Sequence, residues 1–231
     1  MQSIVKHEPA FSLLQVNLAP GEVITAEAGA MVARSSNLTM EVKLNADPNA
    51  SFFGKLKSVF IAFLRKLIGG ESFFVNHFTA PQGGWVWLAP PTSGNIREIP
   101  LQGRSMLFSA GAYLASAGPV SLKMRFGGLR SLLAKEGAFF VEASGAGNIF
   151  ITSYGGIDEV FCNGTYIVDN GHLVGFDSSL DFEIKSAGGG MMGFLASGEG
   201  LVCEFNGQGR VYVQSRNLGS LVGWLSPLLP S

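Results

Sequence analysis

Three histidines are the side chains best suited to bind a metal ion, and their spacing assembles no metal site. His7, His77 and His172 are far apart, and none is paired as His-x-His or His-x-x-x-His. A catalytic metal centre needs several imidazole, carboxylate or thiolate ligands held together. We therefore expect His77 to face outward from a strand and His172 to begin a strand after a turn, and we predict no bound metal.

Nucleophile and phosphate-binding motifs are also missing. The chain contains neither Gly-x-Ser-x-Gly nor a P-loop pattern. Glu98 and Glu159 occupy similar places in two similar segments, which indicates two copies of one surface or interface position rather than an acid and base pair. Cys162 and Cys203 form no Cys-x-x-Cys and are expected to be buried free thiols. We predict no catalytic residue and no cofactor, and hence a non-enzymatic protein.

Composition places the chain among globular proteins. Its 231 residues are 47% hydrophobic and 14% charged, which excludes disorder. With a net charge of −1, the molecule as a whole does not attract the phosphates of a nucleic acid, so DNA binding is not expected. The first residues lack a basic segment followed by an apolar one, and no apolar run reaches about 18 residues. These features predict a cytoplasmic protein.

Internal repetition is the most informative pattern, because such repeats define an architecture. An alternating strand runs to a glycine three times, at Gly21, Gly103 and Gly164. A second strand then runs to Gly29, Gly111 and Gly171, and an apolar strand follows each time. The pattern predicts three repeats, at 11–93, 94–154 and 155–216, followed by a C-terminal tail at 217–231.

Glycine recurs in these turns for a physical reason, since glycine alone adopts a positive φ without steric cost. We expect Gly29, Gly111 and Gly171 to be such structural turn residues. Each repeat then carries a different insert, at 51–68, 125–135 and 186–197, which we expect to form a short helix or helical turn. The predicted fold class is mostly β, with three tandem units and short inserted helices on one side.

Three further segments carry a family resemblance. Glu27–Ala33, Gly198–Gly200 and Gly209–Arg216 resemble, in this order, an uncharacterised bacterial and archaeal family related to the altered-inheritance-of-mitochondria proteins. The similarity covers about residues 3–225. It implies a fold similar to three copies of the trp RNA-binding attenuation protein (TRAP) domain, a small double-stranded β-helix that assembles in rings. No enzymatic activity is implied, and the tryptophan and RNA sites of TRAP are not transferred, because fold alone does not give function.

The insert at 51–68 is the predicted contact element. At helical spacing it has a broad apolar face beside lysines and arginines, which is typical of an interfacial helix, although the same helix could cap the β core or a subunit interface. The residues that we expect to make this contact are Phe52, Lys55, Leu56, Phe60, Phe63, Leu64, Arg65, Lys66 and Leu67.

Charge is unevenly distributed among the predicted repeats. Residues 11–93 have six basic and five acidic side chains, 94–154 have six and three, and 155–216 have three and eight. An acidic third repeat facing a more basic repeat of a second copy favours a head-to-tail homo-oligomer, with a trimer as the first assumption.

We therefore predict an oligomeric scaffold or binding protein that contacts a membrane surface or a protein partner through the 52–68 helix. Peripheral membrane association would accompany the first of these contacts. The alternative is a small-ligand or RNA-binding module that uses clefts between repeats or subunits, although only the second repeat is clearly basic.

Overall fold

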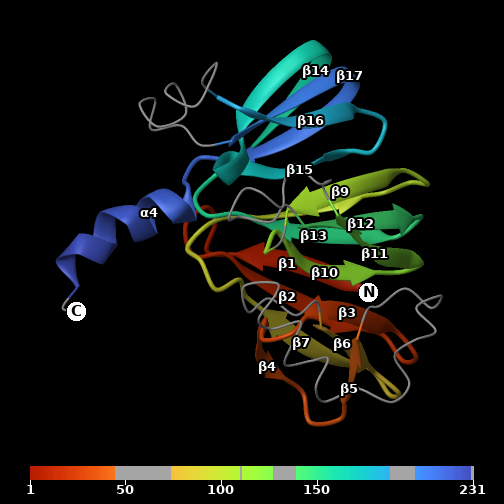
Figure 1. Ribbon diagram of the computed structural model, residues 1–231. Coiled ribbons are helices and arrows are strands. Elements are labelled where there is room, and N and C mark those ends of the chain that lie inside the picture. Colours follow the sequence, from red (N-terminus) through yellow and green to blue (C-terminus); the bar gives the residue numbers. More distant parts are fainter. Residues whose placement is uncertain (45–73, 110, 127–138, 188–200, 230–231) are drawn as a thin grey trace, which may run out of the picture.

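The computed structural model describes residues 1–44, 74–109, 111–126, 139–187 and 201–229. Within them the regular structure is almost entirely antiparallel strand, and one α-helix, α4 (Leu218–Leu225), projects from the body (Figure 1). The fold is therefore mostly β, as predicted. The predicted helical insert at 51–68 lies outside the described residues, and so do nearly all of the inserts at 125–135 and 186–197.

The first sheet is formed by the N-terminal strands. In β2 every second residue is buried, at Leu14, Val16 and Leu18, because successive side chains of a strand point to opposite faces. The order is β1-β2-β7-β4, and all pairs are antiparallel. Its strands are β1 (Gln2–Lys6), β2 (Leu13–Leu18), β7 (Gly84–Leu88) and β4 (Met31–Arg34).

The second sheet joins strands from two parts of the chain. Its order is β5-β6-β3-β10-β13-β8, and the junction is the antiparallel pair of β3 with β10. Its strands are β5 (Thr39–Leu44), β6 (Phe74–Thr79), β3 (Val23–Glu27), β10 (Tyr113–Ala117), β13 (Asn148–Thr152) and β8 (Ile96–Pro100).

The third sheet has a comparable junction between β9 and β15. Its order is β11-β12-β9-β15-β17-β14, and β16 pairs with the first part of β17. Its strands are β11 (Val120–Phe126), β12 (Phe139–Gly145), β9 (Ser105–Ser109), β15 (Leu173–Asp177), β17 (Leu201–Gln214), β14 (Ile157–Asp169) and β16 (Asp181–Ser186).

Strands β14 and β17 form one long hairpin that passes through two facing glycines. Gly164 lies opposite Gly207, with φ angles of +112° and +118°. Residues that carry a side chain rarely adopt these φ angles. Glycine therefore lets the paired strands depart from a regular ladder while they stay paired. In the earlier parts of the chain, separate strands meet at loops that contain Gly21 and Gly103, with φ angles of +83° and +84°.

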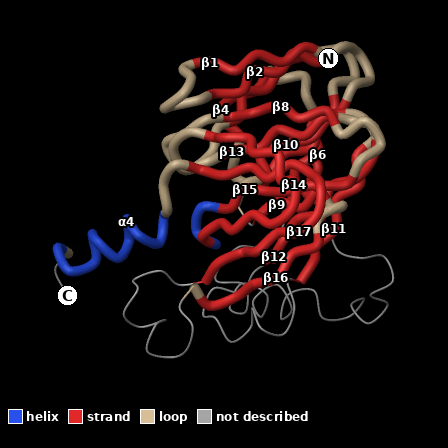
Figure 2. Tube along the Cα trace, turned by 90° about the horizontal axis from the view of Figure 1, so that it is seen from above, coloured by secondary structure: helices blue, strands red, loops and turns tan. Residues whose placement is uncertain are grey.

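Three buried clusters fill the interior and extend across the junctions. The first contains Ile24 and Ala26 of β3 together with Leu114 and Ala115, which belong to β10. The second joins Met106 and Phe108 to Val174. Figure 2 shows the strands as one continuous body from which α4 extends. The cores therefore hold together strands that are distant in sequence.

The third cluster combines aromatic rings with both cysteines. Phe205 is fully buried, and its ring centroid lies 4.9 Å from that of Phe176. Cys162 and Cys203 are buried free thiols, as predicted. Burial raises the pKa of Cys203 to about 12.

Replacing Phe205 by alanine should lower the free energy of unfolding by about 3–5 kcal/mol, because the change leaves a cavity among aromatic rings. Phe161→Ala is the matched control, since Phe161 is 65% exposed; it should cost less than about 1 kcal/mol. Urea unfolding followed by circular dichroism measures both. Equal losses for the two variants would contradict this packing.

Alkaline pH should destabilise the fold through Cys203. Its pKa is raised from 9.0 to about 12, so the unfolded thiol ionises first as the pH rises above 9. The contribution of Cys203 to the free energy of unfolding is fully present below pH 9. Above that pH it falls by up to about 1.4 kcal/mol per pH unit, until the folded thiol also ionises. Urea midpoints between about pH 8 and 10 should fall less steeply for Cys203→Ala than for the wild type. Parallel slopes would refute this assignment.

Candidate functional site

The predicted contact helix lies entirely outside the described residues. The structure therefore places none of the residues expected to make the contact, namely Phe52, Lys55, Leu56, Phe60, Phe63, Leu64, Arg65, Lys66 and Leu67. The candidate surfaces that the structure does describe are elsewhere, in a pocket beside the N-terminus and on the C-terminal helix.

Two of the three predicted turn glycines have the expected conformation. Gly29 and Gly111 have φ angles of +94° and +80°, and no atom lies within 4 Å of where a Cβ would stand. Their backbone conformation, and not lack of space, favours glycine there.

The expectation of a positive φ is wrong for Gly171. This residue lies in the 3-10 turn η1 (Asn170–His172), and its N–H donates to Asp169 Oδ1 at 2.8 Å. A Cβ at Gly171 would come within 2.1 Å of Asn217 Nδ2. Close packing of the Asn217 side chain, and not a reversal with positive φ, therefore explains this glycine.

The histidines remain apart in the folded chain. His77 is half-buried in β6, where partial burial, followed by the charge of Lys43, lowers its pKa. His172 Nδ1 donates to the carbonyl of Gln214 at 2.7 Å, and His7 is exposed. Within the described part of the chain, no three His, Cys, Asp or Glu side chains gather to hold a metal ion.

Glu98 and Glu159 both connect neighbouring strands. Glu98 accepts hydrogen bonds from Ser3 Oγ at 3.0 Å and from Asn148 Nδ2 at 2.5 Å. Glu159 pairs with Arg97 at 3.5 Å and with Arg210 at 3.1 Å. Glu98 and Glu159 are thus each held by separate partners.

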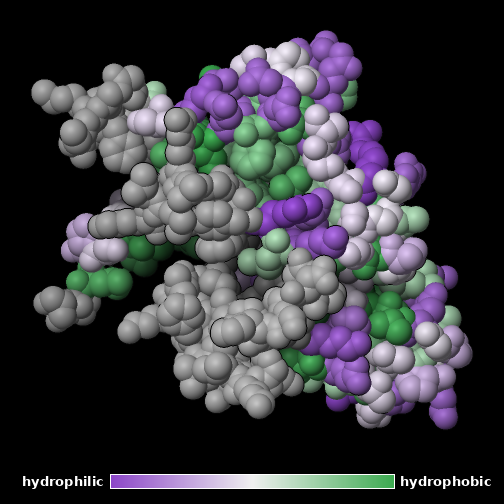
Figure 3. Space-filling model, turned by 45° about the vertical axis from the view of Figure 1, so that its right-hand side comes forward, coloured by the Kyte–Doolittle hydropathy of each residue, from purple (hydrophilic) through white to green (hydrophobic). Residues whose placement is uncertain are grey.

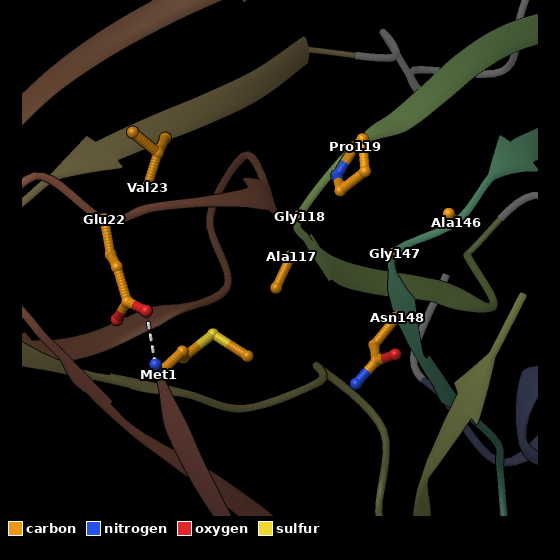
Figure 4. A pocket seen from close by; sticks show the side chains of 9 residues that line it. All are labelled: Met1, Glu22, Val23, Ala117, Gly118, Pro119, Ala146, Gly147 and Asn148. Carbon is orange, nitrogen blue, oxygen red and sulfur yellow. Dashed lines mark hydrogen bonds and ion pairs between the residues drawn. The ribbon is translucent and has the colours of Figure 1, made fainter. Parts of the chain in front are cut away.

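A pocket of about 600 Å³ opens where β3 meets the loops around β10 and β13 (Figure 4). Small residues form much of its wall, and a Cβ at Gly147 would come within 2.2 Å of the Ala117 carbonyl oxygen. The lining residues are Met1, Glu22, Val23, Ala117, Gly118, Pro119, Ala146, Gly147 and Asn148.

The charged groups of this pocket are paired with each other, and the amide of Asn148 donates to Glu98 outside the lining. The Met1 amine forms an ion pair with Glu22 Oε1, and the Ala19 N–H donates to Glu22 Oε2 at 2.7 Å. These two contacts, the amine first, lower the pKa of Glu22. Sequence reasoning missed the pocket, because glycine and alanine in loops carry no signal for a binding site. The pocket suits a small ligand that contacts backbone atoms and short side chains.

The C-terminal helix begins at a capping asparagine. Asn217 Oδ1 accepts a hydrogen bond from the Ser220 N–H at 3.2 Å, which satisfies an otherwise free N–H of the first turn. The helix ends at Leu225, and the hydroxyl of the capping Ser226 donates to the Val222 carbonyl at 2.7 Å. Pro227 follows. Asn217 Nδ2 also lies 3.4 Å from Asp169 Oδ1, which connects the start of the helix to the third sheet.

This helix is apolar and yet has no buried residue. No charged side chain occurs from 217 to 231. The space-filling view shows hydrophobic side chains along this projecting segment (Figure 3). The exposed large apolar residues of the segment are Leu218, Leu221, Val222, Trp224, Leu225, Leu228 and Leu229.

Sequence reasoning treated 217–231 only as a tail, although Leu218, Leu221, Val222 and Leu225 have the spacing of one helix face. Within the described ranges, no helix has both the length and the apolar character needed to cross a bilayer.

Comparison with known proteins agrees with the resemblance seen in the sequence. The family model described as mitochondrial biogenesis AIM24 matches residues 4–216. An uncharacterised protein of Streptococcus pyogenes serotype M6 is 31% identical over 234 residues, which cover 100% of this chain and 92% of that protein. A crystal structure of a Streptococcus pyogenes protein is similar with a TM-score of 0.81 and 29% identity, and the match covers 99% of each chain.

The matched residues include nearly all of the described strands, and the relatives align along 92% and 99% of their length rather than over one motif. The suspected family is thereby confirmed, and the chain belongs to the AIM24 family, described as mitochondrial biogenesis AIM24.

Proposed function

We propose that this protein is a homo-oligomeric scaffold, built from three tandem TRAP-like units, that contacts a membrane surface through exposed apolar segments. The observation that carries the membrane contact is the C-terminal helix α4, which has no buried residue although it is almost wholly apolar.

Recurring strand order supports the three-unit interpretation. In the first part of the chain β7 lies between β2 and β4, while β6 lies between β3 and β5. In the second part β13 lies between β8 and β10, while β12 lies between β9 and β11. In the third part the two halves of β17 lie between β14 and β15 and between β14 and β16. Each part therefore uses the same pairing order.

Charge distribution supports assembly of copies head to tail. The stretch 155–216 has three basic and eight acidic side chains, whereas 94–154 has six and three. A contact between unlike ends of identical chains closes into a ring when the rotation permits, and a trimer is the simplest such ring to test.

The chemistry of α4 favours a lipid surface. Trp224 is 67% exposed, and tryptophan is enriched where protein meets the boundary between lipid and water. Leucine and valine side chains supply apolar area, and the predicted 52–68 helix would add lysines and arginines for anionic head groups. A continuous apolar segment left in water is more typical of a contact surface than of ordinary surface composition.

The pocket beside Met1 supports a second candidate function, the binding of a small ligand between units. Its volume of about 600 Å³ and its position between β3 and the loops around β10 agree with that alternative. Its carboxylate, Glu22, is paired with the Met1 amine, so a ligand there would rely on shape and backbone contacts.

Membrane contact predicts that the protein co-sediments with vesicles of phosphatidylcholine and phosphatidylglycerol. Leu221→Asp and Trp224→Asp should each lower the partition coefficient by roughly tenfold or more, since each places a charge where an apolar side chain would enter the lipid. The measurement is the bound fraction against lipid concentration.

Phe161→Asp is the matched control, because Phe161 is 65% exposed in β14 and lies outside α4. This control should bind vesicles as the wild type does. A wild type that stays in the supernatant would refute the membrane contact and leave a protein partner as the occupant of α4. Undiminished binding of both α4 variants would refute the role of this helix.

A further inference from the structure

Two internal junctions in the sheets follow one register. Each of β4, β10 and β15 contains a register shift, between Met31 and Ala33, between Tyr113 and Ala115, and between Leu173 and Gly175. In β10 and β15, the second residue after this shift pairs with a strand across the junction. Ser116 lies opposite Thr25, and Phe176 lies opposite Leu107.

The partners across the junction are also equivalent. On the other side of β3, Thr25 lies opposite the half-buried His77 of β6. On the other side of β9, Leu107 lies opposite the half-buried Glu142 of β12. Ile167 of β14 lies opposite the half-buried Glu204 in the same way. The second half of β14 is therefore the counterpart of β3 and β9.

Each junction joins a strand of the β10 and β15 type to a strand of the β3 and β9 type. One strand of each type, β4 and the second half of β14, has a free edge with no strand partner among the described residues. On one side β4 pairs with β7, and the second half of β14 pairs with β17. The free side of β4 corresponds to the side of β10 that pairs with β3 and to the side of β15 that pairs with β9. The free side of the second half of β14 corresponds to the side of β3 that pairs with β10 and to the side of β9 that pairs with β15. The two open edges are thus the two halves of a third junction, at opposite ends of the series.

Burial distinguishes the open junction from the filled ones. Leu114 and Val174 are the residues inside the register shifts of β10 and β15, and they are 0% and 1% exposed. Val32, at the same position in β4, is 56% exposed. Leu114 belongs to the core cluster of Ile24 and Ala26, so the junction itself supplies the apolar cover that Val32 lacks.

We propose that β4 of one copy pairs antiparallel with residues 165–168 of β14 in a second copy of this chain. Arg34 would lie opposite Ile167, and Ala33 opposite Val168. Val32 would pack on Tyr166 and Val168 of the second copy, just as Leu114 packs on β3. The same pairing would partly cover Ile167, which is 56% exposed in the single chain, since its counterparts Thr25 and Leu107 are half-buried.

This inference rests on the proposed homo-oligomer and names its interface. Because each copy offers one edge of each type, the contact is head to tail and two unlike surfaces meet. Unpaired strand edges are strong templates for pairing with another chain. The outer edges of β5, β11 and β16 are open in all three parts of the described chain, so they give no such match and serve as controls.

A disulfide cross-link tests the register. The double variant Arg34→Cys/Ile167→Cys should form intermolecular disulfides under mild oxidation, visible as multimers in non-reducing electrophoresis. Arg34→Cys/Thr165→Cys is the control, because that pair is displaced along the strand by two residues. Equal or absent cross-linking in the two variants would overturn the proposed register.

A second experiment separates failure of this interface from failure of the oligomer. Val32→Asp should raise the dissociation constant of the oligomer roughly hundredfold or more, because it places a carboxylate in an apolar junction. Val42→Asp in β5, where the valine is 62% exposed, should assemble as the wild type does. Analytical ultracentrifugation gives the masses, and circular dichroism checks the fold of each variant.

The outcomes are distinct. An oligomer that survives Val32→Asp and forms no register-specific cross-link would overturn this interface and leave the proposed oligomer standing. A wild type that remains monomeric at all concentrations would overturn both.

Discussion

Backbone hydrogen bonds along strand edges are the constraint on which this structure depends. A strand in the interior of a sheet needs a partner on both sides, and each of β3, β9, β10 and β15 finds its second partner in another part of the chain. Apolar side chains follow the backbone, since Leu114 and Val174 are buried in clusters that cross these junctions. Packing and hydrogen bonding therefore act on the same contacts, and the successive parts of the chain hold one another in place.

Chemical groups and apolar surface are distributed in different ways. The carboxylates Glu98 and Glu159 are occupied by neighbouring strands, and Glu22 is paired with the N-terminal amine. Exposed apolar side chains lie at the periphery instead, and those of α4 and of Val32 at the open edge of β4 are among them. Exposed apolar side chains of this kind are suited to contacts with other surfaces.

Much of the local structure could be predicted from the sequence. The alternation of Leu14, Val16 and Leu18 indicated a strand with one buried face, and Gly29 and Gly111 were correctly expected in turns with positive φ. Burial of both cysteines also followed from their type and the absence of a paired motif. Gly171 shows the limit, because a Cβ there would meet the side chain of Asn217, which is distant in sequence.

The sequence by itself determined the strand-rich fold and its turns, because strand periodicity and turn chemistry act over a few neighbouring residues. The family was recognised separately, through the resemblance of a few short segments in order. Only the tertiary structure decided that β3 meets β10 with Thr25 opposite Ser116, that small loop residues enclose a pocket beside Met1, and that α4 stands exposed. These features depend on which distant segments come into contact. The alternation of a strand shows which face is buried, but it does not show which strand will cover its edge.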